Sequence, residues 1–349
     1  MAVKILVRAT NWLGDAVMSI PALRAIRGRW PKAELTILAR QPAGEIFAGQ
    51  GLCDRDILFE HTGRHRGVLG AERLAGELRR EKFDCALLLQ NAFQAAWIAR
   101  RAGIAERIGY DRDARGWLLT KPIPLPRPGE IPAHECYYYL ELVRRAGWLD
   151  RLPEVDEILL HVEPAAVESA RERLRAAGAR AGALAVALAP GAAYGSAKCW
   201  MPERFAQLAD RLIAEFGADV IIFGAAGEQD IATRIAGAMK HRPVALAGQT
   251  RAGELPALFA ACDLFIGNDS GAVHVAGAVG LPVVAIFGPT DPQGTSPVTE
   301  RRSLVRREVA CSPCFLRHCP VDHRCMTRVE VTEVFLAAQK WLSEGARAG

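Results

Sequence analysis

The chain has 349 residues, of which 50% are hydrophobic and 24% charged. This composition is typical of a folded enzyme and excludes long disordered stretches. Its length exceeds what one hydrophobic core usually supports, so two domains of about 150 to 180 residues are expected. The net charge is +5, and residues 1–150 carry 23 Lys and Arg against 17 Asp and Glu, so the basic surplus lies in the first half. That bias suits an anionic partner, although a solvated surface explains it equally well.

Targeting and membrane signals are weak. The first apolar run is short and is typical of a buried strand, without the parts of a secretory signal. No run approaches the roughly 20 apolar residues that a membrane span needs. We therefore expect a cytoplasmic protein whose membrane contact is peripheral. Aromatic residues make up 7% of the chain, and we find no nucleic-acid-binding motif, so nucleic acid is not expected as a partner.

The first half alternates short β-rich runs with helical patterns. Continuous apolar runs such as 86–89 indicate strands that are buried on both faces, as in a parallel sheet covered by helices. Strands are predicted at 4–8, 34–39 and 85–89, and a helix at 15–29.

The second half repeats this alternation of strands and helices, which predicts an α/β fold with a second sheet. Strands are predicted at 184–189, 219–223, 244–247, 264–267 and 283–287, with helices at 202–216 and 327–343. We predict an N-terminal domain over 1–160, a hinge over 161–183 and a C-terminal domain over 184–326. The segment 327–349 is expected to form a final helix that packs back toward the N-terminal domain.

The first candidate site lies where the first strand runs into a helix, because ligands of open α/β sheets bind at the carboxyl ends of the strands. Asp15 lies where a helix N-cap belongs, so it could simply satisfy backbone N–H groups. It could instead accept a proton from an attacking hydroxyl. The same turn offers one glycine, Gly14, where a dinucleotide fingerprint needs three, which disfavours a nicotinamide oxidoreductase.

The second candidate site is a loop of small residues between a predicted strand and the helix that Pro202 opens. Backbone N–H groups at Gly191 can approach phosphate oxygens, and Lys198 can neutralise a leaving diphosphate. The alternative is a solvated loop lysine. The P-loop pattern is absent, which excludes a P-loop NTPase.

The third candidate site follows the strand at 264–267. Ser270 and Gly271 would form the first turn of a helix, whose free N–H groups and positive dipole end suit a diphosphate. His274 lies one turn further on the same face, although a single histidine in such a helix is often a core residue. Glu228 opens another helix at the same sheet edge. It could bind ribose hydroxyls or simply place a favourable charge in a first helical turn.

Nine cysteines in a chain expected to be cytosolic indicate reduced thiols rather than disulfides. Four of them cluster as Cys311, Cys314, Cys319 and Cys325. One Cys-x-x-Cys pair with two further thiols could close a structural metal site. The spacing after the first pair is irregular, however, which favours packed or free thiols.

Taken in order, these motifs resemble the ADP-heptose:lipopolysaccharide heptosyltransferases, glycosyltransferase family 9. The resemblance rests on four segments that span nearly the whole chain, namely 11–15, 190–202, 268–274 and 288–292. The Trp-Leu-Gly-Asp start and the Cys-rich tail are most similar to heptosyltransferase II. The resemblance implies the GT-B fold, in which two Rossmann-like domains with parallel sheets face a central cleft.

By the same resemblance the enzyme would invert the anomeric carbon, require no cofactor or catalytic metal, and move a heptose from ADP-L-glycero-D-manno-heptose to the first heptose of the lipopolysaccharide inner core on Kdo-lipid A. Asp15 would be the general base and Lys198 would neutralise the leaving ADP. The other donor residues would be Gly191, Glu228, Asp269, Ser270, Gly271 and His274. The expected contacts to the anionic glycolipid acceptor are Asn11, Arg64, Arg66, Arg112 and Arg115. The acceptor implies peripheral contact with the inner face of the cytoplasmic membrane.

Three alternatives remain at this level. One is heptosyltransferase I or III, and another is a different GT-B nucleotide-sugar enzyme such as an epimerase. The third is a protein that binds an ADP-sugar without turnover. A base at Asp15 together with a cation at Lys198 argues against the last, because a sensor needs no base.

Overall fold

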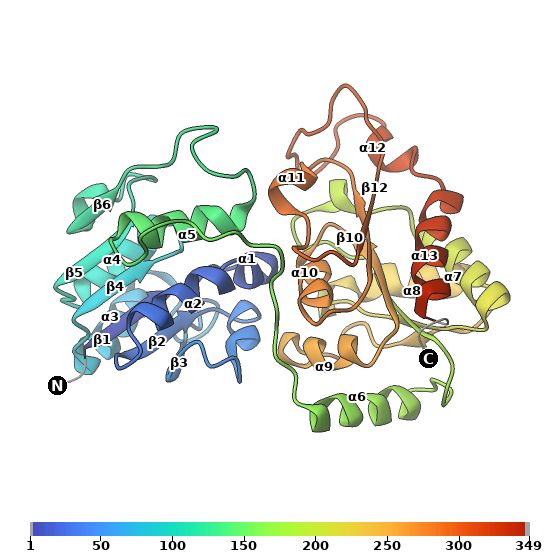
Figure 1. The fold of residues 1–349 in the computed structure, drawn as a ribbon, viewed down its shortest axis with the longest axis horizontal. Coiled ribbons are helices and arrows are strands. Elements are labelled where there is room, and N and C mark those ends of the chain that lie inside the picture. The colour runs from blue at the N-terminus through green and yellow to red at the C-terminus, as the bar shows by residue number, and fades with distance from the viewer. Residues whose placement is uncertain (1–2, 346–349) are drawn as a thin grey trace. The chain divides into compact units, whose positions relative to one another are not determined.

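The computed structural model describes residues 3–345 and divides into two compact units, Met1–Val155 and Asp156–Gly349. Each unit is a parallel sheet of six strands covered by helices on both faces (Figure 1). The predicted α/β fold with two Rossmann-like domains is therefore confirmed.

The sheet of the first unit has the order β3-β2-β1-β4-β5-β6, and every pairing is parallel. Its strands are β1 (Lys4–Arg8), β2 (Glu34–Ala39), β3 (Arg55–Leu58), β4 (Cys85–Leu88), β5 (Glu106–Tyr110) and β6 (Lys121–Ile123). The central strand β1 pairs through Ile5 with Leu35 and with Cys85, and all three side chains are buried. This explains why residues 5–7, at the centre of β1, are all apolar.

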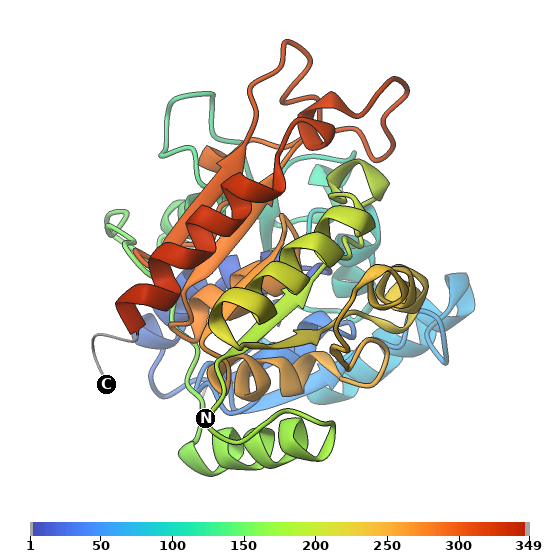
Figure 2. The same cartoon turned by 90° about the vertical axis from the view of Figure 1, so that its right-hand side faces the viewer.

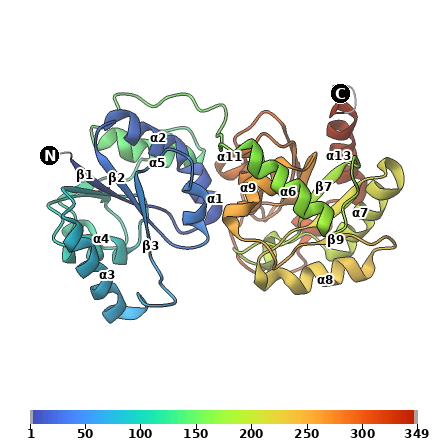
Figure 3. The ribbon, with the colours of Figure 1, turned by 90° about the horizontal axis from the view of Figure 1, so that it is seen from below.

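Helices cover both faces of this sheet (Figure 3). The first face carries α1 (Leu13–Met18), α2 (Ile20–Arg29) and α5 (Glu135–Arg145), and the other carries α3 (Gly67–Glu81) and α4 (Phe93–Arg101). The predicted single helix at 15–29 is wrong in one detail, since it is interrupted at Ser19. The Ser19 hydroxyl donates to the Ala16 carbonyl (2.8 Å) inside the first unit. Such side-chain bonding to nearby backbone competes with regular helix.

The second unit repeats the topology, with the order β12-β11-β10-β7-β8-β9. Counted from its own first strand, this is the same doubly wound order as in the first unit. The strands are β7 (Ala185–Ala189), β8 (Asp219–Ile222), β9 (Val244–Ala245), β10 (Leu264–Asn268), β11 (Val283–Phe287) and β12 (Arg302–Arg306). The loops that follow β7, β8, β10 and β11 therefore gather at one edge, where the predicted donor residues lie.

Figure 2 shows α13, α7 and α8 side by side on one face of this second sheet. These helices are α7 (Pro202–Phe216), α8 (Gln229–Ala238) and α13 (Val331–Gly345), and the other face carries α6 (Pro164–Ala176), α9 (Leu255–Ala260) and α10 (Gly271–Ala278). Two short helices complete the unit, α11 (Pro292–Thr295) and α12 (Arg324–Thr327). The bounds of α7 match the prediction because Pro202 starts it and Gly217, at φ 62°, ends it.

Two segments of the predicted domain scheme lie within the second unit. The predicted hinge 161–183 includes helix α6, which packs on α9, and just before it Leu160 N–H donates to the Ala278 carbonyl (2.7 Å). The predicted final helix also packs within the second unit. The buried side chains of Val334, Phe335 and Ala338 join the core of the second unit, against α7 and the sheet. Among residues 3–345, no helix combines the length and apolarity that crossing a bilayer requires.

Candidate active site

The first unit presents Asp15 just beyond the carboxyl end of β1. The N-cap of α1 is Trp12, which makes no side-chain capping bond, and Asp15 lies in the first turn. The predicted N-cap position of Asp15 is therefore wrong by three residues. Its carboxylate is half-buried, and it is the acidic residue of that first turn. The positive N-terminal end of the short helix α1 stabilises a carboxylate at this position, although this stabilisation is small at a surface.

A second carboxyl group lies near Asp15, and no sequence pattern had indicated it. Glu135 opens α5, a helix that packs on α1. Burial and, as the second cause, the negative charge of Asp15 together raise the pKa of Glu135 to about 7. Tyr139, one helical turn on, is buried and bonded to Glu135. Glu135 can therefore keep its proton up to about pH 7 while it lies beside the Asp15 carboxyl group.

Glu135→Gln is expected to change how stability depends on pH. The folded protein keeps the Glu135 proton up to about pH 7, whereas the unfolded chain releases it near 4.5. The wild type should therefore lose up to about 3 kcal/mol of unfolding free energy as the pH rises from 4.5 to 7. The glutamine variant is always neutral and should lack this loss. Urea denaturation across that pH range measures this loss.

The matched control is Glu157→Gln, at an exposed carboxylate, which should follow the wild-type pH profile of stability. If Glu135→Gln also followed the wild-type profile, the assignment would be contradicted.

In the second unit the structure brings Lys198 and Asp269 together across 71 residues of chain. The Lys198 Nζ lies 2.5 Å from Asp269 Oδ2, and Thr290 Oγ1 donates to the same oxygen (2.5 Å). Asp269 is only 2% exposed, and the lysine side chain is 11% exposed. Lys198 is therefore not the solvated loop lysine of the alternative reading. Its charge is held at the sheet edge by a buried carboxylate, and the β7, β10 and β11 loops meet at this ion pair.

Hydrogen bonds of the Asn268 side chain join the β10 loop to the β7 loop. Asn268 is fully buried at the end of β10, and its Nδ2 donates to the Pro190 carbonyl (2.6 Å). Its Oδ1 accepts from the backbone N–H of Trp200 (3.0 Å). A single side chain thereby joins the start and the end of the Lys198 loop, and sequence reasoning had not assigned it a role.

Glu228 and Gly191 also lie against each other. A methyl group at Gly191 would fall 2.1 Å from the Glu228 carboxyl carbon, so a larger residue there would force that carboxylate to move. Glu228 Oε2 accepts from the backbone N–H of Ala225 (2.7 Å). The carboxylate therefore has a local structural role at a helix start, and its second oxygen remains the candidate for a ribose hydroxyl.

The β10–α10 turn places the last donor candidates. Ser270 is the N-cap of α10 without a side-chain capping bond, and Gly271 begins the helix. His274 is 5% exposed, so most of its ring is held within the second unit. The eight-residue helix α10 therefore starts at the sheet edge that carries the Lys198–Asp269 pair.

The predicted acceptor residues differ in exposure and in the groups that they contact. Arg64 pairs with Glu77 and Arg66 is exposed at the start of α3. Arg112 is 3.5 Å from Asp113. Arg115 is 0% exposed, and its guanidinium donates to the carbonyls of Tyr110 and Gln90 and to the Asn91 side chain. Its donors are used inside the unit, so Arg115 is better assigned to holding the β4 and β5 loops than to contacting an acceptor.

The Cys-rich loop packs on the Lys198 loop. Tyr194 Oη donates to the Phe315 carbonyl (2.6 Å), and Ala197 N–H donates to the Arg317 carbonyl (3.0 Å). A methyl group at Gly195 would lie 2.3 Å from that same Arg317 oxygen. His323 Nε2 lies 2.6 Å from the Ala197 carbonyl. The segment around residues 315–323 therefore shapes the loop that carries Lys198.

The four clustered thiols lie close enough to influence one another. Burial raises the pKa of Cys325, and the thiols of Cys311, Cys314 and Cys319 raise it in the same direction. All nine cysteines are free. In the described part of the chain, no three His, Cys, Asp or Glu side chains are arranged to hold a metal ion. The structure thus gives the proposed structural metal site at these cysteines no support.

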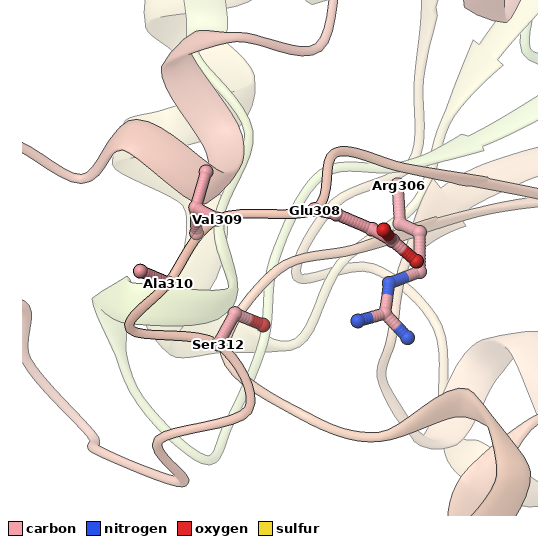
Figure 4. A pocket seen from close by; sticks show the side chains of 5 residues that line it. All are labelled: Arg306, Glu308, Val309, Ala310 and Ser312. Atoms are coloured by element: carbon pink, nitrogen blue, oxygen red, sulfur yellow. The ribbon is translucent and has the colours of Figure 1, made fainter.

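A shallow pocket opens beside the same region but contains none of the predicted residues. Figure 4 shows its lining, in which the side chains of Arg306 and Glu308 lie near each other. The remaining lining residues are Val309, Ala310 and Ser312. Ser312 Oγ donates to the Gly288 carbonyl (2.6 Å), which ties this loop to the end of β11.

Comparison with known proteins decides the family. The model of glycosyltransferase family 9 (heptosyltransferase) matches residues 71–324. The chain belongs to glycosyltransferase family 9. It is therefore a glycosyltransferase, and the predicted family and enzyme class are confirmed.

Sequence and structure matches to relatives of this family 9 enzyme cover most of the chain. It is 29% identical to lipopolysaccharide heptosyltransferase 2 of Escherichia coli, over 87% of this chain and 88% of that one. It is 28% identical to lipooligosaccharide heptosyltransferase 2 of Haemophilus influenzae, over 86% and 88%. Among solved structures, the E. coli ADP-heptose lps heptosyltransferase II superposes with a TM-score of 0.83 at 25% identity, covering 99% of this chain and 100% of that one. The GT-B fold of heptosyltransferases is thereby confirmed.

Proposed function

We propose that this family 9 enzyme transfers a heptose from ADP-L-glycero-D-manno-heptose to the first heptose of the lipopolysaccharide inner core. The observation that carries the proposal is the buried Lys198–Asp269–Thr290 cluster, a fixed cation at the carboxyl edge of a nucleotide-binding type of sheet. The two relatives cited above are both named heptosyltransferase 2, which favours the second transfer over the first or third.

The chemistry is a single inverting displacement. Asp15 accepts the proton of an acceptor hydroxyl as its oxygen bonds to the anomeric carbon of the heptose, and the bond from that carbon to the ADP oxygen breaks. The leaving diphosphate gains negative charge, which Lys198 and the N–H groups at the start of α10 stabilise. Gly191, Ser270, Gly271 and His274 would line the donor, and Glu228 would accept from ribose hydroxyls. No metal enters any step.

The acceptor is proposed to bind the first unit. Asn11, Arg64, Arg66 and Arg112 lie beyond the carboxyl ends of its strands and supply donors for acidic groups on a glycolipid. Incubating the purified enzyme with ADP-heptose and lipopolysaccharide acceptors that carry zero, one or two heptoses tests the assignment by mass spectrometry. Addition to the one-heptose acceptor alone supports it. Addition to the heptose-free acceptor would instead identify a first transferase, and binding of ADP-heptose without any product would identify a sensor.

Peripheral membrane contact is proposed through the first turn of α3. Val68 and Leu69 are 73% and 84% exposed, and Arg66 precedes them. Exposed apolar side chains beside arginines suit an anionic bilayer surface, where each basic residue contributes about 1 kcal/mol.

The variant Val68→Glu/Leu69→Glu is expected to lose most of its binding to vesicles that contain anionic lipid. Its activity on a deacylated, water-soluble acceptor should stay unchanged, because neither side chain contacts the proposed chemistry. Co-sedimentation with vesicles measures the loss. Leu336→Glu, at a side chain 56% exposed on α13, is the matched control and should bind like the wild type. Equal binding by all three proteins would remove this surface from the proposal.

A further inference from the structure

Two arginines of the first unit share one site, and neither has an acidic partner among residues 3–345. Arg8 is the last residue of β1, and Arg40 directly follows β2, the strand paired beside it. Both guanidinium groups lie over the ring of Phe59, at 5.4 Å and 4.6 Å from its centroid. Phe59 directly follows β3, the next strand of the sheet. The carboxyl ends of three neighbouring strands thus bring two positive charges onto one aromatic ring.

The hydrogen bonds of these guanidinium groups are made to neutral groups. Arg8 donates to the carbonyls of Ala9 and Leu38 and to Asn11 Oδ1 (2.7 Å), and Arg40 donates to Gln94 Oε1 (3.0 Å). Within residues 3–345, neither arginine forms a salt bridge, and the Nε atoms of both are buried without a hydrogen-bond partner. Arg8 is only 3% exposed. A buried charge that lacks a counter-charge is costly for the fold.

The electrostatics agree with that geometry. Burial and the neighbouring Arg40 lower the pKa of Arg8 to about 9. Burial, Arg40 and Arg8 lower the pKa of His61 as well. Each of these groups therefore feels an excess of positive charge around it, which an anion would relieve. His61 is exposed and Arg40 is half-buried, so the cluster can be reached from solvent.

We infer that Arg8 and Arg40, with Asn11, Gln94 and His61 beside them, form an oxyanion-binding subsite of the first unit. Two guanidinium groups with free N–H donors suit a phosphate or a carboxylate, which accepts two or more charge-assisted hydrogen bonds. Asn11 lies in the same β1–α1 connection as Asp15. The subsite therefore fits an acidic group on the sugar acceptor, and this last step rests on the proposed function.

Inorganic phosphate is the probe that tests the subsite without any sugar. Thermal unfolding is measured against phosphate concentration, with sodium chloride holding the ionic strength constant, because phosphate also stabilises proteins by exclusion from their surface. Saturating ADP is present so that the donor region of the second unit is filled. The wild type should gain melting temperature with phosphate. Arg40→Gln should bind phosphate about tenfold more weakly or worse, the loss of one charge-assisted hydrogen bond.

The control is Arg80→Gln, at an exposed arginine on the far end of α3, which should respond to phosphate like the wild type. Without phosphate, Arg40→Gln should be as stable as the wild type or more stable, because it relieves the repulsion of Arg8. A purely structural role predicts the reverse. If Arg40→Gln is destabilised without phosphate and keeps the full phosphate response, the inference is overturned.

Kinetics with intact acceptor then locate the anion. Phosphate and acetate should inhibit transfer competitively with the acceptor, and Arg40→Gln should raise the acceptor KM about tenfold while the ADP-sugar KM stays unchanged. Inhibition that competes with the ADP-sugar alone would overturn the acceptor assignment. If phosphate protects the first unit but no sugar is transferred, the subsite stands and the proposed function fails, so the two failures are distinguishable.

Discussion

The Asp15→Asn variant is expected to bind the ADP-sugar as the wild type does and to transfer heptose about 10³-fold more slowly. An amide has nearly the same shape as a carboxylate but cannot accept the proton of the attacking hydroxyl, and a positioned base contributes about 10² to 10⁴ in rate. Single-turnover transfer measures the rate, and calorimetry with ADP measures binding.

The control for this variant is Asp150→Asn, at an exposed aspartate of the first unit that has no place in the proposed site. It should transfer heptose at the wild-type rate. A second readout separates a chemical from a structural role. The charge of Asp15 raises the pKa of Glu135, so the asparagine variant should titrate Glu135 at lower pH. Full activity in Asp15→Asn would remove the base assignment.

Lys198→Met is expected to lower the unfolding free energy of the second unit by about 3 kcal/mol and to abolish detectable transfer. The substitution leaves Asp269, 2% exposed, as a buried carboxylate whose one remaining partner among the bonds described above is Thr290. Breaking one side of a buried ion pair typically costs about 3 to 5 kcal/mol, because the other charge stays buried. Denaturant unfolding measures the loss.

The double variant Lys198→Met/Asp269→Asn distinguishes the two roles of the lysine. It removes both charges, so most of the lost stability should return. Transfer should not return, since no cation then faces the leaving diphosphate. Recovery of activity together with stability would mean that Lys198 acts on the fold alone.

Several strands and the helix α7 were predictable because the local sequence marks their core and their ends. The strands β1, β2 and β11 are rich in apolar residues, and the structure gives the predicted bounds for all three. The edge strands β3, β6 and β12 and the inner strand β5 were missed, whereas the edge strand β9 was predicted. Both β3 and β12 contain arginines and expose parts of both faces, so neither shows an apolar run or a clean alternation.

The candidate site was predictable only residue by residue. Glycines and a lysine in strand-to-helix loops indicate phosphate chemistry locally, which is how Gly191 and Lys198 were found. The pairing of Lys198 with Asp269 depends on which strands are neighbours, and local sequence does not encode that. Glu135 was missed for the same reason, since its proximity to Asp15 arises from the packing of α5 on α1.

The contact between the Cys-rich loop and the Lys198 loop bears on how the chain acquires its activity during synthesis. Tyr194 and Ser196 bond to residues 121 and 122 positions further along. When synthesis has reached the end of β11, every proposed donor residue has been made. The Lys198 loop still lacks the backbone of Phe315 and Arg317, on which it packs. Nascent chains that stop short of Phe315 should lack donor affinity, and they also lack α13, whose side chains complete the core of the second unit.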